Sequence, residues 1–333
     1  MSADEFDTIR RLFAPLATNP AARGLVDDVA VLEASGSLVV TTDAIVEGVH
    51  FLPDDPIETV AKKALRVNLS DLTAKGARCV GVLLTLVWPD QRPSAQLTTF
   101  ADGLAEDLTF FDVPLLGGDT ARTPGPLVVS MTALGEALEA RIPSRADAIP
   151  GDHLWVTGFI GEAYLGLRAL TELPPVLGAS PDDQVDLAAI QVRSSYRTPY
   201  PPVPLAECIA RYARASTDVS DGLVADAANI ANASGVAIRL DAEAIPLGLA
   251  GHNYVAKHGA KGLVELITGG DDYQALFTAD SAHRREILAI SRAAGVNAVV
   301  IGHVTEGRGV KVIDANGAEI ATYALGHRHT LGR

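Results

Sequence analysis

Aspartate follows an apolar run at four places in the chain, each time beside glycine, serine or threonine. The four segments are Thr41–Asp43, Leu116–Thr120, Asp218–Gly222 and Gly269–Asp272. Glycine lets the backbone bend, or approach a ligand, where a side chain would collide. Apolar runs that end in such turns are typical of buried strands. The pattern therefore predicts strands whose ends carry carboxylates.

Extended and helical patterns alternate along the chain. Strands are expected at 38–42, 80–87, 154–157, 237–240, 275–278, 298–301 and 311–313. Helices are expected at 9–16, 57–77, 97–108, after Gly161 through 170, from 205, 223–235 and 283–294. The stretch 142–152 contains Pro143, Pro150 and Gly151, which indicate a boundary. The alternation predicts an α+β protein with two domains, residues 1–140 and 150–333. A surface loop is expected at 172–186 because three prolines interrupt it.

The chain is acidic, with 27 Lys and Arg against 41 Asp and Glu and a formal net charge of −14. That charge disfavours nucleic acid and anionic lipid as partners. Cys79 and Cys208 are too few for a disulfide framework or a thiolate zinc site. The N-terminus lacks the features of a signal peptide, and the longest apolar run, 80–88, is too short to cross a bilayer. We therefore expect a soluble cytoplasmic protein.

Several familiar catalytic motifs are missing from the sequence. There is no Gly-x-x-x-x-Gly-Lys-Ser/Thr loop, no Gly-x-Gly-x-x-Gly after the first strand, no His-Glu-x-x-His and no Gly-x-Ser-x-Gly. Six aspartates remain at expected strand and helix ends: Asp28, Asp43, Asp71, Asp119, Asp218 and Asp221. Each alone is explained as a helix cap or a solvated residue. Together with neighbouring hydroxyl groups they offer the oxygen ligands of Mg²⁺, which recruits polyphosphate, so phosphoryl transfer is favoured.

Six motifs, taken in order, resemble those of the thiamine-monophosphate kinase family. They lie at 27–28, 41–51, 68–72, 117–120, 218–223 and 269–273. That family belongs to the aminoimidazole-ribonucleotide-synthetase-like superfamily. The resemblance implies a homodimer whose N-terminal domains pair into a β-barrel. It also implies that residues 1–140 bind ATP and Mg²⁺ and dimerise, while residues 150–333 complete the nucleotide and substrate site.

The resemblance implies transfer of the ATP γ-phosphoryl group to thiamine monophosphate, with several Mg²⁺ ions. It places the metal at Asp28, Thr41, Thr42, Asp43, Asp71, Asp119, Asp218 and Asp221, ATP at Gly118, Asp119, Arg145 and Ser220, and the substrate at His50, Asp271 and Tyr323. Asp43, Asp119 and Asp221 are the catalytic candidates among these. The family's Gly-Gly-Glu-Asp stands here as Gly-Gly-Asp-Asp at 269–272.

The sequence leaves two other functions open. A sibling ATP-dependent synthetase would keep the fold and the nucleotide site but use another acceptor. A non-catalytic protein that binds divalent cations would use the same aspartates without releasing ADP.

Overall fold

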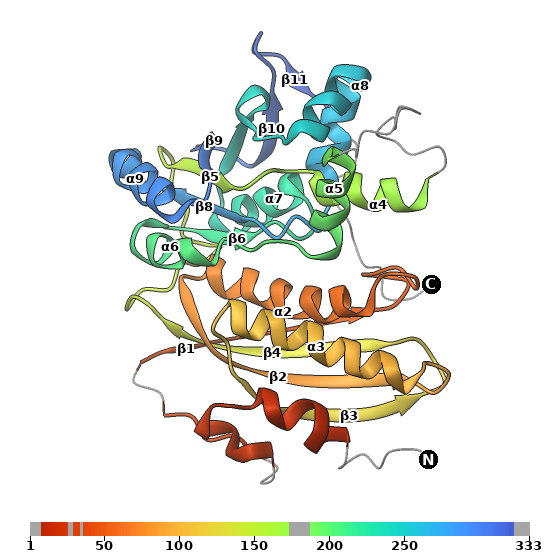
Figure 1. Ribbon diagram of the computed structural model, residues 1–333. Coiled ribbons are helices and arrows are strands. Elements are labelled where there is room, and N and C mark those ends of the chain that lie inside the picture. Colours follow the sequence, from red (N-terminus) through yellow and green to blue (C-terminus); the bar gives the residue numbers. More distant parts are fainter. Residues whose placement is uncertain (1–7, 26–28, 34–35, 173–186, 323–333) are drawn as a thin grey trace. The chain divides into compact units, whose positions relative to one another are not determined.

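The computed structural model describes residues 8–25, 29–33, 36–172 and 187–322. The chain divides into two units (Figure 1). Unit 1 takes in Met1–Leu72 and Ala77–Ala140, and unit 2 takes in Thr73–Gly76 and Arg141–Arg333. Each unit is built on its own β-sheet.

The sheet of unit 1 has four strands in the order β1-β4-β2-β3. The strands are β1 (Leu38–Val46), β2 (Ala77–Pro89), β3 (Leu115–Thr123) and β4 (Val128–Ala137). β4 runs antiparallel to β1 and to β2, whereas β2 and β3 are parallel. Because β1 and β3 both lie at edges, the sheet formed by the described residues of one chain is open and forms no closed barrel.

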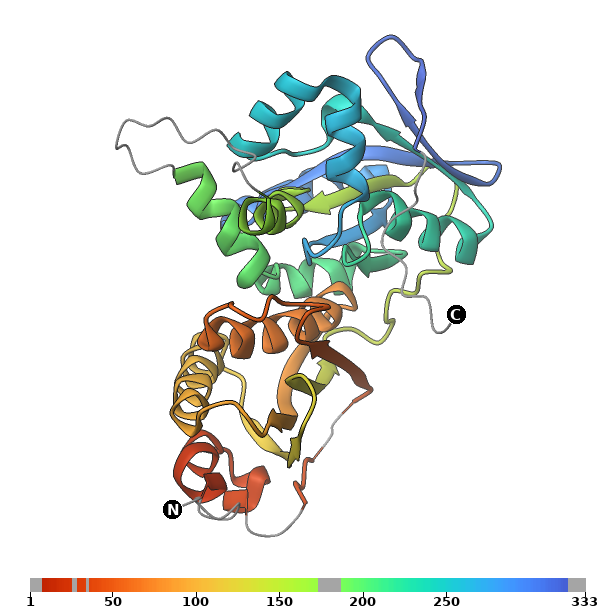
Figure 2. The ribbon, with the colours of Figure 1, turned by 90° about the vertical axis from the view of Figure 1, so that its right-hand side faces the viewer.

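Two helices cover one face of this sheet (Figures 1 and 2). They are α2 (Ile57–Ala74) and α3 (Ser94–Phe110). Val60, Ala64 and Val67 recur at helical spacing along α2 and are buried, which explains why this segment forms a helix on an apolar sheet. Gly103 of α3 allows a close approach, since a Cβ there would lie 2.6 Å from the main-chain oxygen of Glu58.

The N-terminal segment differs from the expected single helix. It forms a π-helical turn, η1 (Ile9–Phe13), followed by the 3₁₀ turns η2 (Ala14–Leu16) and η3 (Pro20–Leu25). Pro15 has no amide hydrogen and its ring clashes with the preceding turn, so a regular α-helix cannot continue through it. Phe13 is nevertheless buried.

The sheet of unit 2 has seven strands in the order β11-β10-β7-β9-β5-β8-β6. The strands are β5 (His153–Thr157), β6 (Ser216–Asp218), β7 (Ala237–Asp241), β8 (Ala275–Ala279), β9 (Ala298–Thr305), β10 (Gly309–Ile313) and β11 (Glu319–Ile320). The β7–β10 pair is parallel and the other pairs are antiparallel. All five residues of β8 are buried, because both faces of the sheet are covered.

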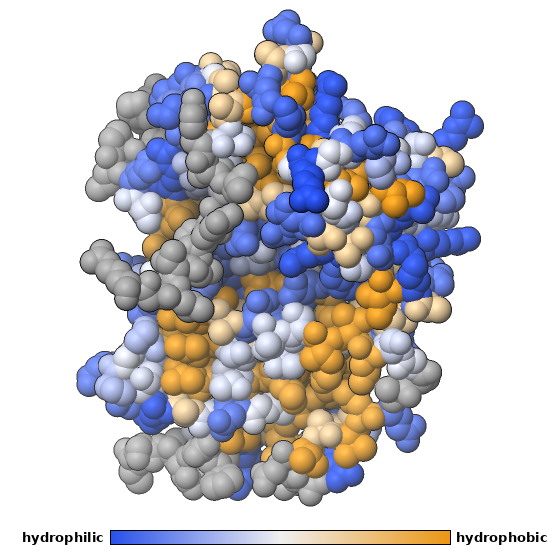
Figure 3. All heavy atoms as spheres, turned by 180° about the vertical axis from the view of Figure 1, so that it is seen from behind, coloured by the Kyte–Doolittle hydropathy of each residue, from blue (hydrophilic) through white to orange (hydrophobic). Residues whose placement is uncertain are grey.

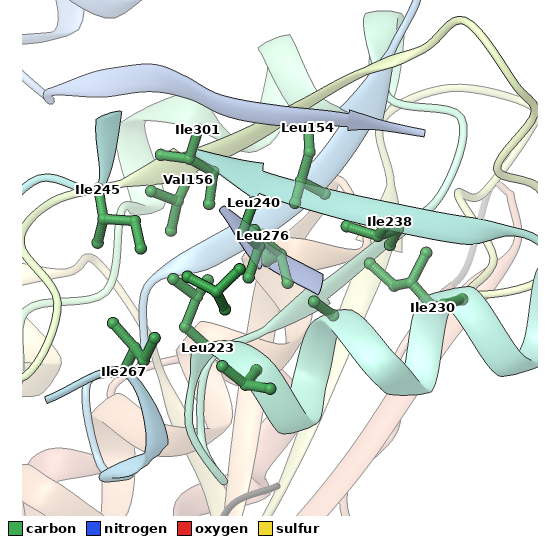
Figure 4. Packing of buried hydrophobic residues seen from close by; sticks show 14 of the residues in the cluster. Leu154, Val156, Leu223, Ile230, Ile238, Leu240, Ile245, Ile267, Leu276 and Ile301 are labelled. Carbon is green, nitrogen blue, oxygen red and sulfur yellow. The ribbon is translucent and has the colours of Figure 1, made fainter. Parts of the chain in front are cut away.

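Helices cover both faces of this second sheet. They are α4 (Glu162–Thr171), α5 (Leu187–Arg197), α6 (Ala206–Tyr212), α7 (Leu223–Ser234), α8 (Leu249–Thr268) and α9 (Arg284–Ala294), with 3₁₀ turns η4 (Val203–Leu205), η5 (Ala242–Ala244) and η6 (Ser281–His283). On one face, Leu223 and Ile230 of α7 belong to the same buried cluster as Leu154 and Val156 of β5 (Figure 4). On the other face, Trp155 packs with residues of α6 and α9.

Two helices of unit 2, α5 and α8, are absent from the sequence-based expectation. α8 contains three glycines, and Gly259 has a φ of +61°, which kinks the helix. Glycine lowers helix propensity, so the helical pattern of this segment is weak. Residues 173–186 of the expected surface loop lie outside the described residues. Across the described part of the chain, every helix is too short or too polar to span a bilayer.

Candidate functional site

Unit 1 contains a contacting pair of carboxyl groups, Asp43 on β1 and Asp71 on α2. Burial, the charge of Asp71 and a hydrogen bond to Asp71 raise the pKa of Asp43 to about 6. The hydroxyl of Thr41 donates to Oδ2 of Asp71 at 2.5 Å. A pKa raised by a second carboxylate means that the pair holds more negative charge than its surroundings neutralise. The pair is therefore suited to hold a cation.

The side-chain periodicities of β1 and α2 bring Asp43 and Asp71 together. Side chains alternate along β1, so Thr41 and Asp43 point to the same face, the one that α2 covers. Asn68, one turn before Asp71 on α2, fixes the strand to the helix. Its Oδ1 accepts from the main-chain N–H of Asp43 at 3.2 Å, and its Nδ2 donates to the main-chain oxygen of Ala64 at 2.9 Å.

The side chain of Thr42 lies on the opposite face of the sheet. Its hydroxyl donates to the main-chain oxygen of Met131 at 3.0 Å and accepts from the hydroxyl of Thr132 at 3.2 Å. A cation held by the carboxyl groups of Asp43 and Asp71 could therefore reach Thr42 only through its main-chain oxygen.

Asp119, like Thr42, lies on the face of the sheet that α2 and α3 leave uncovered. Its strand, β3, is the edge strand farthest from β1. The register aligns Ala44, Ser130, Thr85 and Asp119 in one row across the four strands, next to the row that contains Asp43. Residues in adjacent rows point to opposite faces. Three strand spacings separate β1 from β3, or about 14 Å. Since Mg²⁺–oxygen bonds are about 2.1 Å long, Asp43 and Asp119 of one chain cannot hold the same ion.

Gly118 permits an unusually close approach between β3 and β2. Its φ is +156°, and a Cβ there would lie 1.8 Å from the main-chain oxygen of Leu84. The next residue, Asp119, is exposed, and its Oδ1 accepts from the main-chain N–H of Thr120 at 2.9 Å. The Gly-Gly-Asp segment thus presents a carboxylate beside a bare stretch of backbone.

His50 lies in the turn that follows β1. Its Nδ1 accepts from the main-chain N–H of Val46 at 3.1 Å, so the neutral ring carries its proton on Nε2. The main-chain oxygen of His50 accepts from Nζ of Lys63 at 2.9 Å. Lys63 is only 1% exposed, so a buried ammonium group of α2 fixes this turn.

In unit 2, the segments Asp218–Gly222 and Gly269–Tyr273 pair through their main chains. The N–H of Asp271 donates to the oxygen of Ser220 at 2.9 Å, and the N–H of Tyr273 donates to the oxygen of Val219 at 2.8 Å. A Cβ on Gly270 would lie 2.4 Å from the oxygen of Ser220. Two motifs that are distant in the sequence thus form one structure, which brings Ser220 and Asp221 next to Asp271.

The second of these segments is strained. Asp271 and Tyr273 have φ values of +70° and +50°, which non-glycine residues rarely adopt. The hydroxyl of Tyr273 donates to Oδ1 of Asp271 at 3.1 Å. Strain of this kind persists only where surrounding contacts impose it, and it concentrates at functional sites.

Arg145 and Asp226 flank the Asp218–Gly222 segment. The guanidinium group of Arg145 donates to the hydroxyl of Thr217, from Nε at 3.1 Å and from Nη2 at 2.9 Å. Oδ2 of Asp226 accepts from the main-chain N–H groups of Ser220 and Asp221, each at 3.1 Å. Burial and the charge of Asp221 raise the pKa of Asp226 to about 7, although both hydrogen bonds and Arg145 oppose the shift.

Asp272, whose carboxyl group is buried like that of Asp226, holds the Gly269–Tyr273 segment. It accepts from the main-chain N–H groups of Gly161 at 2.8 Å and Ala163 at 3.4 Å, where α4 begins. Burial raises the pKa of Asp272 to about 8. Asp272 therefore anchors the Gly269–Tyr273 segment to the N-terminus of α4.

Three supporting residues were missed as site residues by the sequence reasoning: Lys63, Asn68 and Asp226. Each had a signal. Lys63 lies on the apolar side of α2, between Val60 and Val67, where an unpaired lysine would be costly. Asp226 is an acidic residue in the first turn of a helix that follows an aspartate-rich loop.

The donor set suits Mg²⁺ better than a metal held by protein ligands alone. Throughout the described ranges, no three His, Cys, Asp or Glu side chains form a ready metal-binding group. Mg²⁺ is usually bound through one or two carboxylates, with waters and substrate phosphates as the other ligands, and the Asp43–Asp71 pair offers this. Asp28 and Tyr323 lie outside the described residues, so their predicted roles stay predictions.

The sequence matches two family descriptions in succession. Residues 26–137 match "AIR synthase related protein, N-terminal domain", and residues 150–315 match "AIR synthase related protein, C-terminal domain". The two matches are to the N-terminal and the C-terminal domain of one family, and they follow one another in that order along the chain.

Individual relatives and solved structures agree with this. Thiamine-monophosphate kinase of Caulobacter vibrioides is 42% identical over 98% of this chain and 90% of its own length. The crystal structure of thiamine-monophosphate kinase from Stenotrophomonas maltophilia has a TM-score of 0.78 at 32% identity, covering 91% of this chain and 95% of that one. A structure named "AaThiL complexed with AMPPCP and TMP" has a TM-score of 0.75 at 29% identity and covers 97% of both chains.

Proposed function

The chain belongs to the thiamine-monophosphate kinase family of AIR synthase related proteins, and from this membership we propose its activity. It transfers the γ-phosphoryl group of ATP to thiamine monophosphate, which gives thiamine diphosphate and ADP. The observation that carries the proposal is the 42% identity to a thiamine-monophosphate kinase over 98% of this chain. A structural neighbour that holds AMPPCP and TMP supports both substrates.

The main obstacle to this reaction is electrostatic. Both substrates are anionic, and the chain itself carries a formal net charge of −14. The acceptor is a phosphate oxygen that is already ionised at neutral pH, so no strong general base is required. Positioning and charge neutralisation therefore account for most of the catalysis. When bound, Mg²⁺ would supply this neutralisation and orient the phosphates in line.

The residues divide this task between the units. In unit 1, Thr41, Asp43 and Asp71 form one oxygen-rich ligand set, while Gly118 and Asp119 present backbone and carboxylate to a nucleotide. In unit 2, Asp218 and Asp221 offer further ligands, and Ser220 and Arg145 contact ATP. The proposed substrate residues are His50, Asp271 and Tyr323. Two further metal ligands are proposed: Thr42, through its main-chain oxygen, and Asp28.

Asp271 suits a thiamine substrate on charge grounds. Its carboxylate is held in place by the hydroxyl of Tyr273 and by a main-chain bond to Ser220. The thiazolium ring of thiamine is positively charged, and an opposite charge a few ångströms away stabilises it in a partly buried site. Because the carboxylate already holds this position before the substrate binds, little conformational entropy is lost on binding.

We also propose that the protein is a homodimer whose N-terminal sheets close into a barrel. The face of the unit 1 sheet without helices exposes apolar side chains (Figure 3), among them Leu38 at 45% and Val40 at 58%. Exposed apolar edge strands invite pairing. A second copy of the chain would cover this face and both free edges.

A homodimer whose sheets close into a barrel would bring the β1 edge of one chain beside the β3 edge of its partner, which would shorten the distance between Asp43 and Asp119. Within one chain these carboxylates lie on opposite faces and edges of the sheet. In a two-fold dimer, Asp43 of one chain and the partner's Asp119 would then hold separate ions of one active site. Co-expressed Asp43→Asn and Asp119→Asn chains with different tags test this arrangement.

The isolated mixed dimer would then contain one intact site and one site with both substitutions, and would show about half of the wild-type activity. Both mutant homodimers would be inactive. A mixed dimer without activity, or a failure to isolate any mixed dimer, would exclude this arrangement.

A coupled assay for ADP tests the proposed activity against its alternatives. With ATP and Mg²⁺, ADP release that depends on thiamine monophosphate supports the kinase. Release only with another phosphorylated or carboxylated acceptor would indicate a sibling synthetase. Cation binding without ADP release for any acceptor would indicate a non-catalytic protein.

A further inference from the structure

We propose that Asp226, in the first turn of α7, is a positioning residue that fixes the Asp218–Gly222 segment for binding of the magnesium–nucleotide complex. The inference deepens the proposed function and rests on it for the identity of the ligand. Asp226 itself would touch neither the metal nor the nucleotide. It would act through the two residues whose main-chain N–H groups it accepts.

The geometry around Asp226 supports this role. A single oxygen, Oδ2, accepts from the N–H groups of both Ser220 and Asp221 at 3.1 Å, while Oδ1 accepts from Nδ2 of Asn229 at 3.4 Å. Asp226 is 1% exposed, so water cannot replace these bonds. The carboxyl group therefore determines where two consecutive residues of the segment stand, including the carboxylate of Asp221.

The Gly269–Tyr273 segment contacts the Asp218–Gly222 segment on the side away from Asp226. The oxygen of Ser220 accepts from the N–H of Asp271, and Gly222 lies so close that a Cβ there would be 2.7 Å from the oxygen of Gly269. The segment is thus held between Asp226 and the Gly269–Tyr273 segment. Loss of one side would leave Ser220 and Asp221 free to move away from the position that these contacts set.

Two substitutions separate an acceptor role from a charge role. Asp226→Asn keeps an oxygen that can occupy the place of Oδ2, while its NH₂ group can donate to the side-chain oxygen of Asn229 after that amide flips. Asp226→Leu is similar in size but has no acceptor, so both main-chain N–H groups lose their partner. If Asp226 positions the segment, the asparagine variant should rescue what the leucine variant loses.

A matched control exists elsewhere in unit 2. Ser291 of α9 is also buried, donates to the main-chain oxygen of Val296 and accepts from the N–H of Ala298 at 3.1 Å. Ser291→Ala removes two buried hydrogen bonds to the main chain, as Asp226→Leu does, but away from the Asp218–Gly222 segment. It should lower thermal stability without changing nucleotide binding.

Amide hydrogen exchange provides a readout that does not depend on turnover. In Asp226→Leu, the peptide covering residues 216–224 should exchange at least about tenfold faster, as expected for the loss of one hydrogen bond. Asp226→Asn and Ser291→Ala should leave this peptide within about threefold of the wild type. Equal exchange in the wild type and in Asp226→Leu would overturn the proposal.

Binding and kinetics complete the test. Titration with AMPPCP and Mg²⁺ should show weaker binding for Asp226→Leu, and kcat/KM should fall by on the order of 10²-fold, since small misplacements carry such costs. Asp226→Asn should retain both. If Asp226→Asn is as impaired as Asp226→Leu, the charge rather than the acceptor oxygen matters, and the proposal fails. If the wild type forms no thiamine diphosphate, the proposed function fails, while the exchange and AMPPCP measurements still decide the role of Asp226.

Discussion

Replacement of Asp43 by asparagine should remove activity and, at the same time, stabilise the metal-free protein. The two carboxyl groups of Asp43 and Asp71 are in contact and partly buried, which raises the pKa of Asp43 from 3.8 to about 6. Without a cation, this arrangement opposes folding at neutral pH. Asparagine removes one charge, keeps the shape and can donate a hydrogen bond to Asp71.

The magnitude follows from the pKa shift. Between pH 3.8 and about 6 the folded state binds more protons at Asp43 than the unfolded state does, so stability falls as the pH rises through this window. The full shift corresponds to about 3 kcal/mol at pH 8, and about half of it is present at pH 5. Asp43→Asn should therefore raise the free energy of unfolding at pH 8 by about 1–3 kcal/mol, with a smaller gain at pH 5.

The assay is urea unfolding in EDTA at pH 5 and pH 8, paired with the turnover of thiamine monophosphate in Mg²⁺. Turnover should fall by on the order of 10³-fold, because a preorganised electrostatic group is lost. Asp102→Asn, an exposed substitution on α3, is the control and should change neither quantity. Wild-type turnover in Asp43→Asn, or a lower stability than the wild type at pH 8, would refute the reasoning.

Three further predictions concern the substrate, the nucleotide and the metal. Asp271→Asn should keep the strained backbone, because asparagine tolerates positive φ, yet raise KM for thiamine monophosphate by about tenfold with little change in KM for ATP, as steady-state kinetics would show. Gly118→Ala should weaken ATP binding and lower the unfolding temperature, because a Cβ would lie 1.8 Å from the oxygen of Leu84; unchanged calorimetric affinity for AMPPCP would contradict this. Affinity for Mg²⁺ should rise with pH through about 6, where Asp43 loses its proton, and a pH-independent titration would contradict it.

The sequence could predict the local parts of the site. Helical spacing shows that Asn68 and Asp71 share a face of α2, and both do point toward β1. Strand alternation likewise shows that Thr41 and Thr42 cannot point to the same face. The motif resemblance named both as metal ligands, and the structure places only the side chain of Thr41 beside the carboxyl pair.

The long-range parts could not be predicted from local patterns. β4 lies between β1 and β2, and this order separates Asp43 from Asp119 although both follow apolar runs. The main-chain pairing of Asp271 with Ser220 joins segments about 50 residues apart, and depends on β6 and β8 being neighbours. Packing of whole elements, rather than propensity, decides such contacts.

The most direct measurement follows labelled phosphorus from ATP. Incubation with [γ-³²P]ATP, thiamine monophosphate and Mg²⁺ should place the label in the terminal phosphate of thiamine diphosphate, in proportion to the ADP formed and with none on the protein. EDTA should prevent the transfer. Label in inorganic phosphate alone, label retained on the protein, or transfer that proceeds without a divalent cation would contradict direct, metal-assisted transfer between the two phosphates.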